Sequence, residues 1–90
     1  MGNNYKGGIF LENLRLFVGT TCPFCKKVED YIEKNNISGV ELINIDKDKE
    51  ARNYLIEKGG KKQVPCLFIG EEALYESLDI ISYLKDKFNK

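Results

Sequence analysis

The chain has 90 residues, with 14 basic and 14 acidic side chains, no histidine, 42% apolar residues and 31% charged residues. This length and composition fit one globular domain, and the balanced charge provides no basic face of the kind that nucleic-acid binding requires. The absence of histidine excludes a Cys-His protease pair, a histidine zinc ligand and an imidazole general base.

Residues 1–13 are predicted to be an N-terminal extension to a folded domain at 14–90. Glycine and asparagine fill most of residues 2–8, which favours a mobile tail; alternatively, the apolar residues 9–11 form an extra edge strand. The start lacks the charged-then-apolar pattern of a signal peptide, and no apolar run approaches the roughly 18 residues of a membrane span. We therefore expect a cytoplasmic protein without membrane contact.

The next elements alternate between strand and helix. The apolar run 14–18 predicts a strand that is buried on both faces. Pro23 suits the first position of a helix, and apolar residues recur at helical spacing through 24–32 before Asn35 ends the pattern. A second short apolar run, at 40–45, predicts a second strand.

A second helix follows the second strand. Asp46 or Asp48 can cap its start, and the glycine pair 59–60 ends it. Two further apolar runs, 67–69 and 73–75, are separated by Gly-Glu-Glu and predict a β-hairpin.

The chain ends with a helix that Ser77 is expected to cap and that runs to Phe88 with one apolar face. The order is therefore βαβαββα, and the strand-helix-strand crossover makes the first two strands parallel. We predict an α/β fold with one four-stranded mixed sheet, covered by the first and third helices on one face and by the second helix on the other.

Cys22-Pro23-Phe24-Cys25 is a C-x-x-C motif placed between the first strand and the first helix. Three cysteines are too few for a secreted disulfide scaffold, which favours a catalytic or metal-binding pair. A thiol at the first turn of a helix faces unpaired N–H groups and the positive end of the helix dipole, both of which favour thiolate. Cys22 is thus the expected nucleophile, and Cys25 the thiol that resolves its mixed disulfides. Lys26 and Lys27 either add positive charge here or are simply solvated.

Three motifs together resemble the glutaredoxin family of the dithiol C-P-F-C type: the cysteine motif, Val64-Pro65 before the third strand and Glu76-Ser77 before the last helix. The resemblance implies a thioredoxin-like fold and a glutathione-dependent thiol-disulfide oxidoreductase. It also implies a cis bond before Pro65 and pairing of the Val64 backbone with the cysteine of glutathione. The Glu-Ser turn is similar, in addition, to that of glutathione transferase N-terminal domains.

The resemblance also implies how glutathione would bind. Lys62, with Lys61 or Arg52 nearby, would meet the glycine carboxylate. Ser77, with the first amides of the last helix, would bind the γ-glutamyl carboxylate, a role compatible with simple helix capping; Glu76, or Asp79 further into the helix, would lie beside the γ-glutamyl end. The expected site consists of catalytic Cys22 and Cys25, with Thr21, Phe24, Lys62, Val64, Pro65, Glu76 and Ser77 binding glutathione.

Several positions depart from the family pattern. Gly19 stands where many glutaredoxins carry lysine, Gln63 replaces threonine or serine, and Tyr75-Glu76 replaces a Gly-Gly turn. These changes affect the expected glutathione affinity rather than the fold, and Tyr75 is expected to cover one side of the groove. Cys66 is predicted to be a buried apolar filler, with a third redox thiol as the alternative.

The leading functional hypothesis is an enzyme that reduces glutathione mixed disulfides and protein disulfides. It would use glutathione as co-substrate, without a tightly bound cofactor or metal, and would act as a monomer on glutathionylated or disulfide-containing proteins. The alternatives are a redoxin that a thioredoxin reductase reduces, and a glutathione-ligated iron-sulfur or metal-binding module that uses Cys22 as a ligand.

Overall fold

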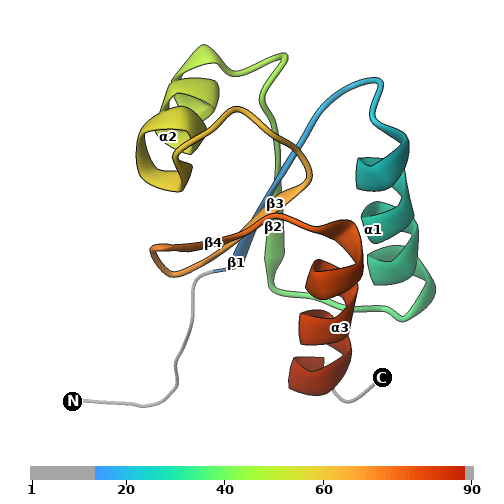
Figure 1. Ribbon diagram of the computed structural model, residues 1–90. Coiled ribbons are helices and arrows are strands. Elements are labelled where there is room, and N and C mark those ends of the chain that lie inside the picture. Colours follow the sequence, from blue (N-terminus) through green and yellow to red (C-terminus); the bar gives the residue numbers. More distant parts are fainter. Residues whose placement is uncertain (1–13, 89–90) are drawn as a thin grey trace.

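The computed structural model describes residues 14–88, and the predicted extension at 1–13, with its alternative edge strand, lies outside them. The order βαβαββα is confirmed (Figure 1). The elements are β1 (Leu14–Val18), α1 (Pro23–Lys34), β2 (Val40–Asn44), α2 (Lys49–Gly59), β3 (Cys66–Ile69), β4 (Glu72–Leu74) and α3 (Ser77–Phe88).

The four strands form one mixed sheet in the order β2-β1-β3-β4. β1 and β2 are parallel, with Leu16 opposite Leu42, because α1 carries the chain back to the same end of the sheet. β3 runs antiparallel to both β1 and β4. The turn between β3 and β4 contains Gly70 at a φ of 64°, a left-handed conformation that glycine adopts without a steric penalty.

Helices cover both faces of the sheet, as the sequence predicts: α1 and α3 lie on one face and α2 on the other (Figure 1). Alternate side chains of β1 lie on opposite faces of the sheet, because successive side chains along a strand point in opposite directions. Leu14, Leu16 and Val18 pack in the core under α1 and α3, whereas Phe17 packs in the core under α2. This division confirms a first strand that is buried on both sides.

The ends of the elements settle one open alternative and correct two details of the prediction. Asp48, and not Asp46, caps α2, since its side chain accepts a hydrogen bond from the N–H of Ala51. Ser77 is the first helical residue of α3, and the carbonyl of Glu76 accepts the first helical hydrogen bond, from Ile80 N–H at 2.8 Å. β4 begins one residue early, at Glu72, which leaves Tyr75 outside the strand.

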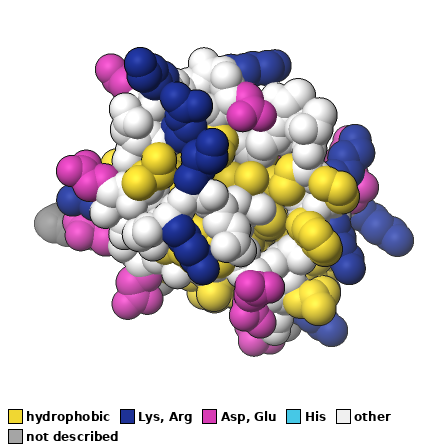
Figure 2. All heavy atoms as spheres, turned by 45° about the horizontal axis from the view of Figure 1, so that its top comes forward, with side chains coloured by type: hydrophobic (Ala, Val, Ile, Leu, Met, Phe, Trp, Pro, Cys, Tyr) yellow, Lys and Arg dark blue, Asp and Glu magenta, His cyan; other side chains and the backbone are white. Residues whose placement is uncertain are grey.

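The start of α1 and the loop before β3 lie at one end of the sheet (Figure 1). The molecular face that looks toward this end carries both acidic and basic side chains, and apolar side chains gather on one half of it (Figure 2). The fold therefore brings the two motifs of the predicted site to a common surface.

Candidate active site

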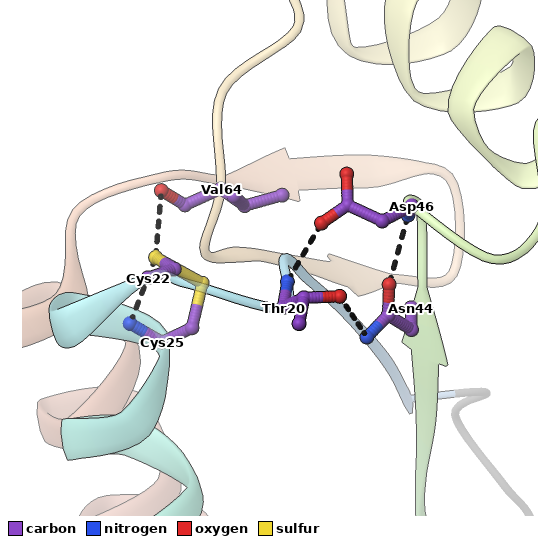
Figure 3. The surroundings of a disulfide bond; sticks show 6 residues. All are labelled: Thr20, Cys22, Cys25, Asn44, Asp46 and Val64. Atoms are coloured by element: carbon purple, nitrogen blue, oxygen red, sulfur yellow. Dashed lines mark hydrogen bonds between the residues drawn. A yellow bond between two sulfur atoms is a disulfide. The ribbon is translucent and has the colours of Figure 1, made fainter.

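Cys22 and Cys25 form a disulfide at the start of α1, with their Cα atoms 5.2 Å apart (Figure 3). Cys22 occupies the N-cap position, with extended backbone angles of −130° and 103°, and Pro23 follows as the first helical residue. Cys22 is half-buried, whereas Cys25 is fully buried one turn deeper. The two sulfurs thus meet within a single turn, and the outer one is the more accessible to a partner.

The backbone of α1 interacts directly with the outer sulfur. The N–H of Cys25 donates a hydrogen bond to Cys22 Sγ at 3.1 Å. This is the interaction that an N-cap side chain makes with one of the unpaired donors of a helix start. The same donor favours negative charge on the sulfur when the disulfide is open, because a hydrogen bond to an ionised acceptor is stronger than one to a neutral acceptor.

Val64 lies directly against the cysteine pair. Its bond to Pro65 is cis, which confirms the expectation from the family resemblance. Cys22 Sγ is 3.7 Å from the carbonyl oxygen of Val64. A disulfide sulfur carries no hydrogen, so in the oxidised form this is a contact, which becomes a hydrogen bond when Cys22 is a thiol.

A clamp of three polar residues, Thr20, Asn44 and Asp46, holds the loop in front of Cys22 (Figure 3). The N–H of Thr20 donates to Asp46 Oδ2 at 2.7 Å, and Asn44 Nδ2 donates to the Thr20 hydroxyl at 3.3 Å. Asn44 Oδ1 in turn accepts from the N–H of Asp46 at 2.8 Å. The hydrogen bonds from Thr20 lower the pKa of Asp46, with smaller contributions from the charges of Lys62 and Arg52.

The clamp is a functional feature that sequence reasoning missed, because Asp46 was considered only as a helix cap. Gly19 is part of the same arrangement. A Cβ at Gly19 would lie 3.4 Å from Val64 Cγ2 and 3.7 Å from both Asp46 Oδ2 and Cys22 Cβ. The loop therefore passes close to the nucleophile, to Val64 and to the clamp at a position without a side chain.

A groove of about 290 Å³ extends from Val64 between the starts of α1 and α3. It contains five of the seven residues predicted to bind glutathione. Thr21 and Lys62 are exposed and lie outside its lining. The lining residues are Phe24, Lys27, Gln63, Val64, Pro65, Tyr75, Glu76, Ser77 and Leu78. Binding of glutathione by the predicted residues stays a prediction, and Lys27 is the cation in the lining.

Tyr75 forms one wall of this groove and also packs above Cys66. Its hydroxyl donates to the carbonyl of Lys61 at 3.0 Å, and Lys61 Nζ lies 4.8 Å from the ring centre. Cys66 is completely buried and is not part of a disulfide. Burial raises the pKa of the Cys66 thiol to about 11, and burial together with the nearby Cys66 raises that of Tyr75. These properties agree with a filler role for Cys66.

Residues 14–88 were also compared with what a metal site and a membrane span require. No three Cys, Asp or Glu side chains gather there in a way that would hold a metal ion. No helix in the same range is long and apolar enough to cross a membrane.

The glutaredoxin family model matches residues 14–74, a range that includes the cysteine pair, Val64-Pro65 and β1 to β4. The chain belongs to the glutaredoxin family. Pig glutaredoxin-1 is 28% identical to it over 75 residues, which cover 78% of this chain and 71% of the relative. A glutaredoxin of Neisseria meningitidis serogroup A is 25% identical over 61 residues, covering 68% and 72%.

Solved structures place this glutaredoxin in the thioredoxin-like fold. Wheat glutaredoxin superposes with a TM-score of 0.62 at 26% identity, covering 83% of this chain and 71% of that one. A thioredoxin-like protein superposes with a TM-score of 0.68 at 24% identity, covering 79% of this chain and 97% of that one. Glutathione transferase Omega 3C from Trametes versicolor superposes with a TM-score of 0.72 at 21% identity, covering 90% of this chain and 36% of that one. At this identity the likeness concerns the fold only. Family and geometry together support a thiol-disulfide oxidoreductase with a redox-active pair at Cys22 and Cys25.

Proposed function

We propose that this protein uses glutathione to reduce glutathione mixed disulfides through Cys22, and protein disulfides through Cys22 together with Cys25. One observation carries the proposal: the accessible sulfur of the pair accepts a hydrogen bond from a helix-start N–H and contacts Val64, which lines a groove. Such a sulfur is stabilised as thiolate, the form that attacks disulfides. Glutathione acts as co-substrate, no tightly bound cofactor takes part, and the protein works as a cytoplasmic monomer.

The monothiol reaction needs Cys22 alone. The Cys22 thiolate attacks the glutathionyl sulfur of a mixed disulfide, and the substrate thiolate leaves and takes up a proton. A second glutathione, as thiolate, then attacks the glutathionyl sulfur on Cys22. Oxidised glutathione leaves, and Cys22 returns to thiolate. The two electrons that reduce the substrate to a thiol therefore come from glutathione.

The dithiol reaction uses Cys25 as well. The Cys22 thiolate attacks one sulfur of a protein disulfide and forms a mixed disulfide with it, while the other sulfur leaves and takes up a proton. Cys25 then loses its proton and attacks Cys22 Sγ, and the substrate sulfur leaves and takes up a proton. The product is the Cys22–Cys25 disulfide of the present structure, which two molecules of glutathione reduce again.

The groove offers glutathione several partners. The backbone of Val64, beside Cys22, would pair with the cysteine residue of the tripeptide as a single residue of an added strand. Ser77 and the first amides of α3 would bind the γ-glutamyl carboxylate, because a helix start attracts anions. Phe24, Pro65 and Glu76 line the groove between these points, and Lys27 supplies a positive charge.

Turnover of a mixed disulfide of glutathione with a small thiol tests the proposal. The assay couples the reaction to glutathione reductase and NADPH, and a parallel assay replaces glutathione and its reductase with thioredoxin reductase. We expect turnover that depends on glutathione, and a much lower rate with thioredoxin reductase. The opposite ranking would contradict glutathione dependence and favour a thioredoxin-reductase-fed redoxin. A brown dimer from anaerobic purification would instead favour the iron-sulfur alternative.

A further inference from the structure

The short loop at residues 19–21 connects the end of β1 to the start of α1 and is fastened to the sheet by a side chain. The N–H of Thr20 donates to Asp46 Oδ2 at 2.7 Å (Figure 3). Asp46 follows β2 directly after Ile45, whose N–H donates to the carbonyl of Val18 at 2.9 Å and continues the pairing of β1 with β2. The Asp46 carboxylate therefore links the loop to a rigid part of the fold.

Little space separates this loop from the reactive sulfur. A Cβ at Gly19 would lie 3.4 Å from Val64 Cγ2 and 3.7 Å from both Asp46 Oδ2 and Cys22 Cβ. Cys22 Sγ is in turn 3.7 Å from the carbonyl oxygen of Val64 and 3.1 Å from the backbone nitrogen of Cys25. A movement of the loop would therefore shift Cys22 relative to both Val64 and α1.

Closure of the disulfide requires a defined direction at Cys22. Cys25 Sγ must approach Cys22 Sγ roughly opposite the sulfur that leaves, because exchange at a sulfur is an in-line displacement. Cys25 is completely buried within α1, so its position is fixed by the helix. Cys22 is the N-cap and has an extended backbone, so its position also depends on the loop before it. A misplacement of reacting groups by about 1 Å can cost about 100-fold in rate.

We propose that Asp46 is a positioning residue for the second half of the dithiol reaction. Its carboxylate holds Thr20 and the loop, and thereby keeps Cys22 Sγ in line with Cys25 Sγ while the disulfide closes. Asp46 acts through its acceptor atom rather than through its charge, so an amide at this position should replace it. The proposal rests on the proposed roles of Cys22 as nucleophile and Cys25 as resolving thiol, but not on glutathione as the reductant.

Reaction of the pre-reduced full chain with dipyridyl disulfide, a neutral reagent, separates the two steps. The Cys22 thiolate attacks one sulfur of the reagent, and a first thiopyridone leaves and takes up a proton. Cys25 then loses its proton and attacks Cys22 Sγ, and a second thiopyridone leaves and takes up a proton. The protein supplies both electrons and ends as the Cys22–Cys25 disulfide. Stopped-flow absorbance records both thiopyridones: the rate of the first phase rises with reagent concentration, and that of the second, the closure, does not.

Two variants of Asp46 separate its acceptor atom from its charge. Asp46→Ala removes both and should slow closure about tenfold, while the first phase changes less than about threefold, because an external reagent can adjust its own direction of approach. Asp46→Asn removes the charge but keeps an acceptor for the N–H of Thr20, so both phases should stay within about twofold of the wild-type rates. Retention of closure in the conservative variant is not expected if the charge of the carboxylate is what matters.

Two further variants control for stability and folding. Asp48 also accepts one backbone N–H, that of Ala51 at 3.1 Å, but at the start of α2. Asp48→Ala should therefore lower stability to a similar extent, which urea unfolding measures, and leave both phases unchanged. Asn44→Ala keeps Asp46 but removes the hydrogen bonds of Asn44 to the Thr20 hydroxyl and to Asp46 N–H. It should slow closure about threefold, and it decides the test if Asp46→Ala does not fold.

Three results would overturn the proposal. The first is closure at the wild-type rate in Asp46→Ala, or in Asn44→Ala where Asp46→Ala does not fold. The second is closure that is as slow in Asp46→Asn as in Asp46→Ala, since this would assign the effect to charge. The third is equally slow closure in Asp48→Ala, since this would assign it to a general loss of stability. A wild-type chain without a first phase would contradict Cys22 as nucleophile, and with it the proposed function, whereas a failure of glutathione dependence alone would leave both phases unchanged.

Discussion

Cys22 and Cys66 are the same type of residue in two neighbouring regions, yet their surroundings give them opposite properties. Cys22 is half-buried at the start of α1 and touches the carbonyl of Val64. Cys66 follows two residues after Val64, at the start of β3, and is completely buried. The cis Val64–Pro65 peptide therefore lies between a reactive region and an inert one.

The contrast comes from the groups that surround each sulfur. Cys22 Sγ accepts a hydrogen bond from a helix-start N–H, which stabilises negative charge. Cys66 packs with Phe17, Leu55 and Phe68 in the core under α2, and burial raises its pKa to about 11. The difference teaches that the backbone donors and solvent around a cysteine, rather than the residue itself, decide whether it reacts.

The largest expected effect is the loss of the reactive thiol. Cys22→Ser should abolish reduction of a glutathionylated peptide, because no other described cysteine combines access with a helix-start N–H. Cys25→Ser should keep much of that activity but lose reduction of protein disulfides by the dithiol route. Peptide release, followed by mass spectrometry, measures both reactions. Equal losses in the two variants would contradict the division of roles.

The two regions should also differ in alkylation. The raised pKa of Cys66 leaves its thiolate fraction at pH 8 about a hundredth of that of a cysteine with the reference value of 9.0, and burial slows its reaction further. In the reduced native protein, iodoacetamide should therefore label Cys22 at least 100-fold faster than Cys66. Peptide mapping after timed quenching gives both rates. Comparable rates would show that Cys66 is accessible and would revive the alternative of a third redox thiol.

Gly59→Ala should make Cys66 more accessible to alkylation and should leave the surroundings of Cys22 unchanged. An added Cβ would collide with the Tyr75 hydroxyl and would lie 3.2 Å from Tyr75 Cζ and 3.5 Å from Phe68 Cζ. We expect a loss of about 2 kcal/mol in the free energy of unfolding, as for other overpacked sites, and faster labelling of Cys66. Urea unfolding and the alkylation assay measure these effects.

The neighbouring glycine provides the control for that variant. Gly60 has a φ of 94° and nothing within 4 Å of an added Cβ, so Gly60→Ala strains the backbone without touching Tyr75. It should lower stability by about 1 kcal/mol and should not accelerate Cys66 labelling beyond what this loss of stability produces. Equal rates of Cys66 labelling in the two variants, once corrected for their measured difference in stability, would show that Tyr75 does not protect Cys66.

The smallest expected effect concerns the clamp beside the reactive region. The folded pKa of Asp46 is lowered, so its contribution to stability is present above the unfolded pKa and is lost as the pH falls through the folded pKa. Asp46→Asn keeps an acceptor for Thr20 N–H but removes the titrating carboxyl group. The free energy of unfolding of this variant should therefore fall less on acidification than that of the wild type. Urea unfolding between pH 2 and pH 6 measures the difference, with Asp46→Ala as the variant that also loses the acceptor. Parallel pH profiles for wild type and Asp46→Asn would contradict the role of the carboxylate.

Much of the fold could be predicted from the sequence because its signals are local. The spacing of apolar residues gave every strand and helix of residues 14–88, and Pro23 and Gly60 marked helix ends as expected. Boundaries of β2, β3, β4 and α3 differ by one residue from the prediction. At β4 and α3 the hydrogen bonds between β3 and β4, and from Ile80 to Glu76, determine where the element begins.

The site was less accessible to prediction. The cysteine motif and Val64-Pro65 could be identified because they are short motifs, and five of the seven expected glutathione-binding residues line the groove. Lys62 was assigned to glutathione from the family resemblance, and in the structure it lies outside the lining of the groove. The clamp joins residues that are 26 positions apart in the chain, and no sequence spacing records such a contact.

The sequence by itself determined the alternation of strands and helices and the placement of two cysteines at a helix start, since both depend on neighbouring residues. The tertiary structure alone decided that Thr20, Asn44 and Asp46 come together, that Lys62 lies outside the lining of the groove, and that Phe24 and Leu78 both line it. The physical reason is that burial, electrostatic screening and contact across the sheet depend on distances in space, which the folded chain sets between residues remote in sequence.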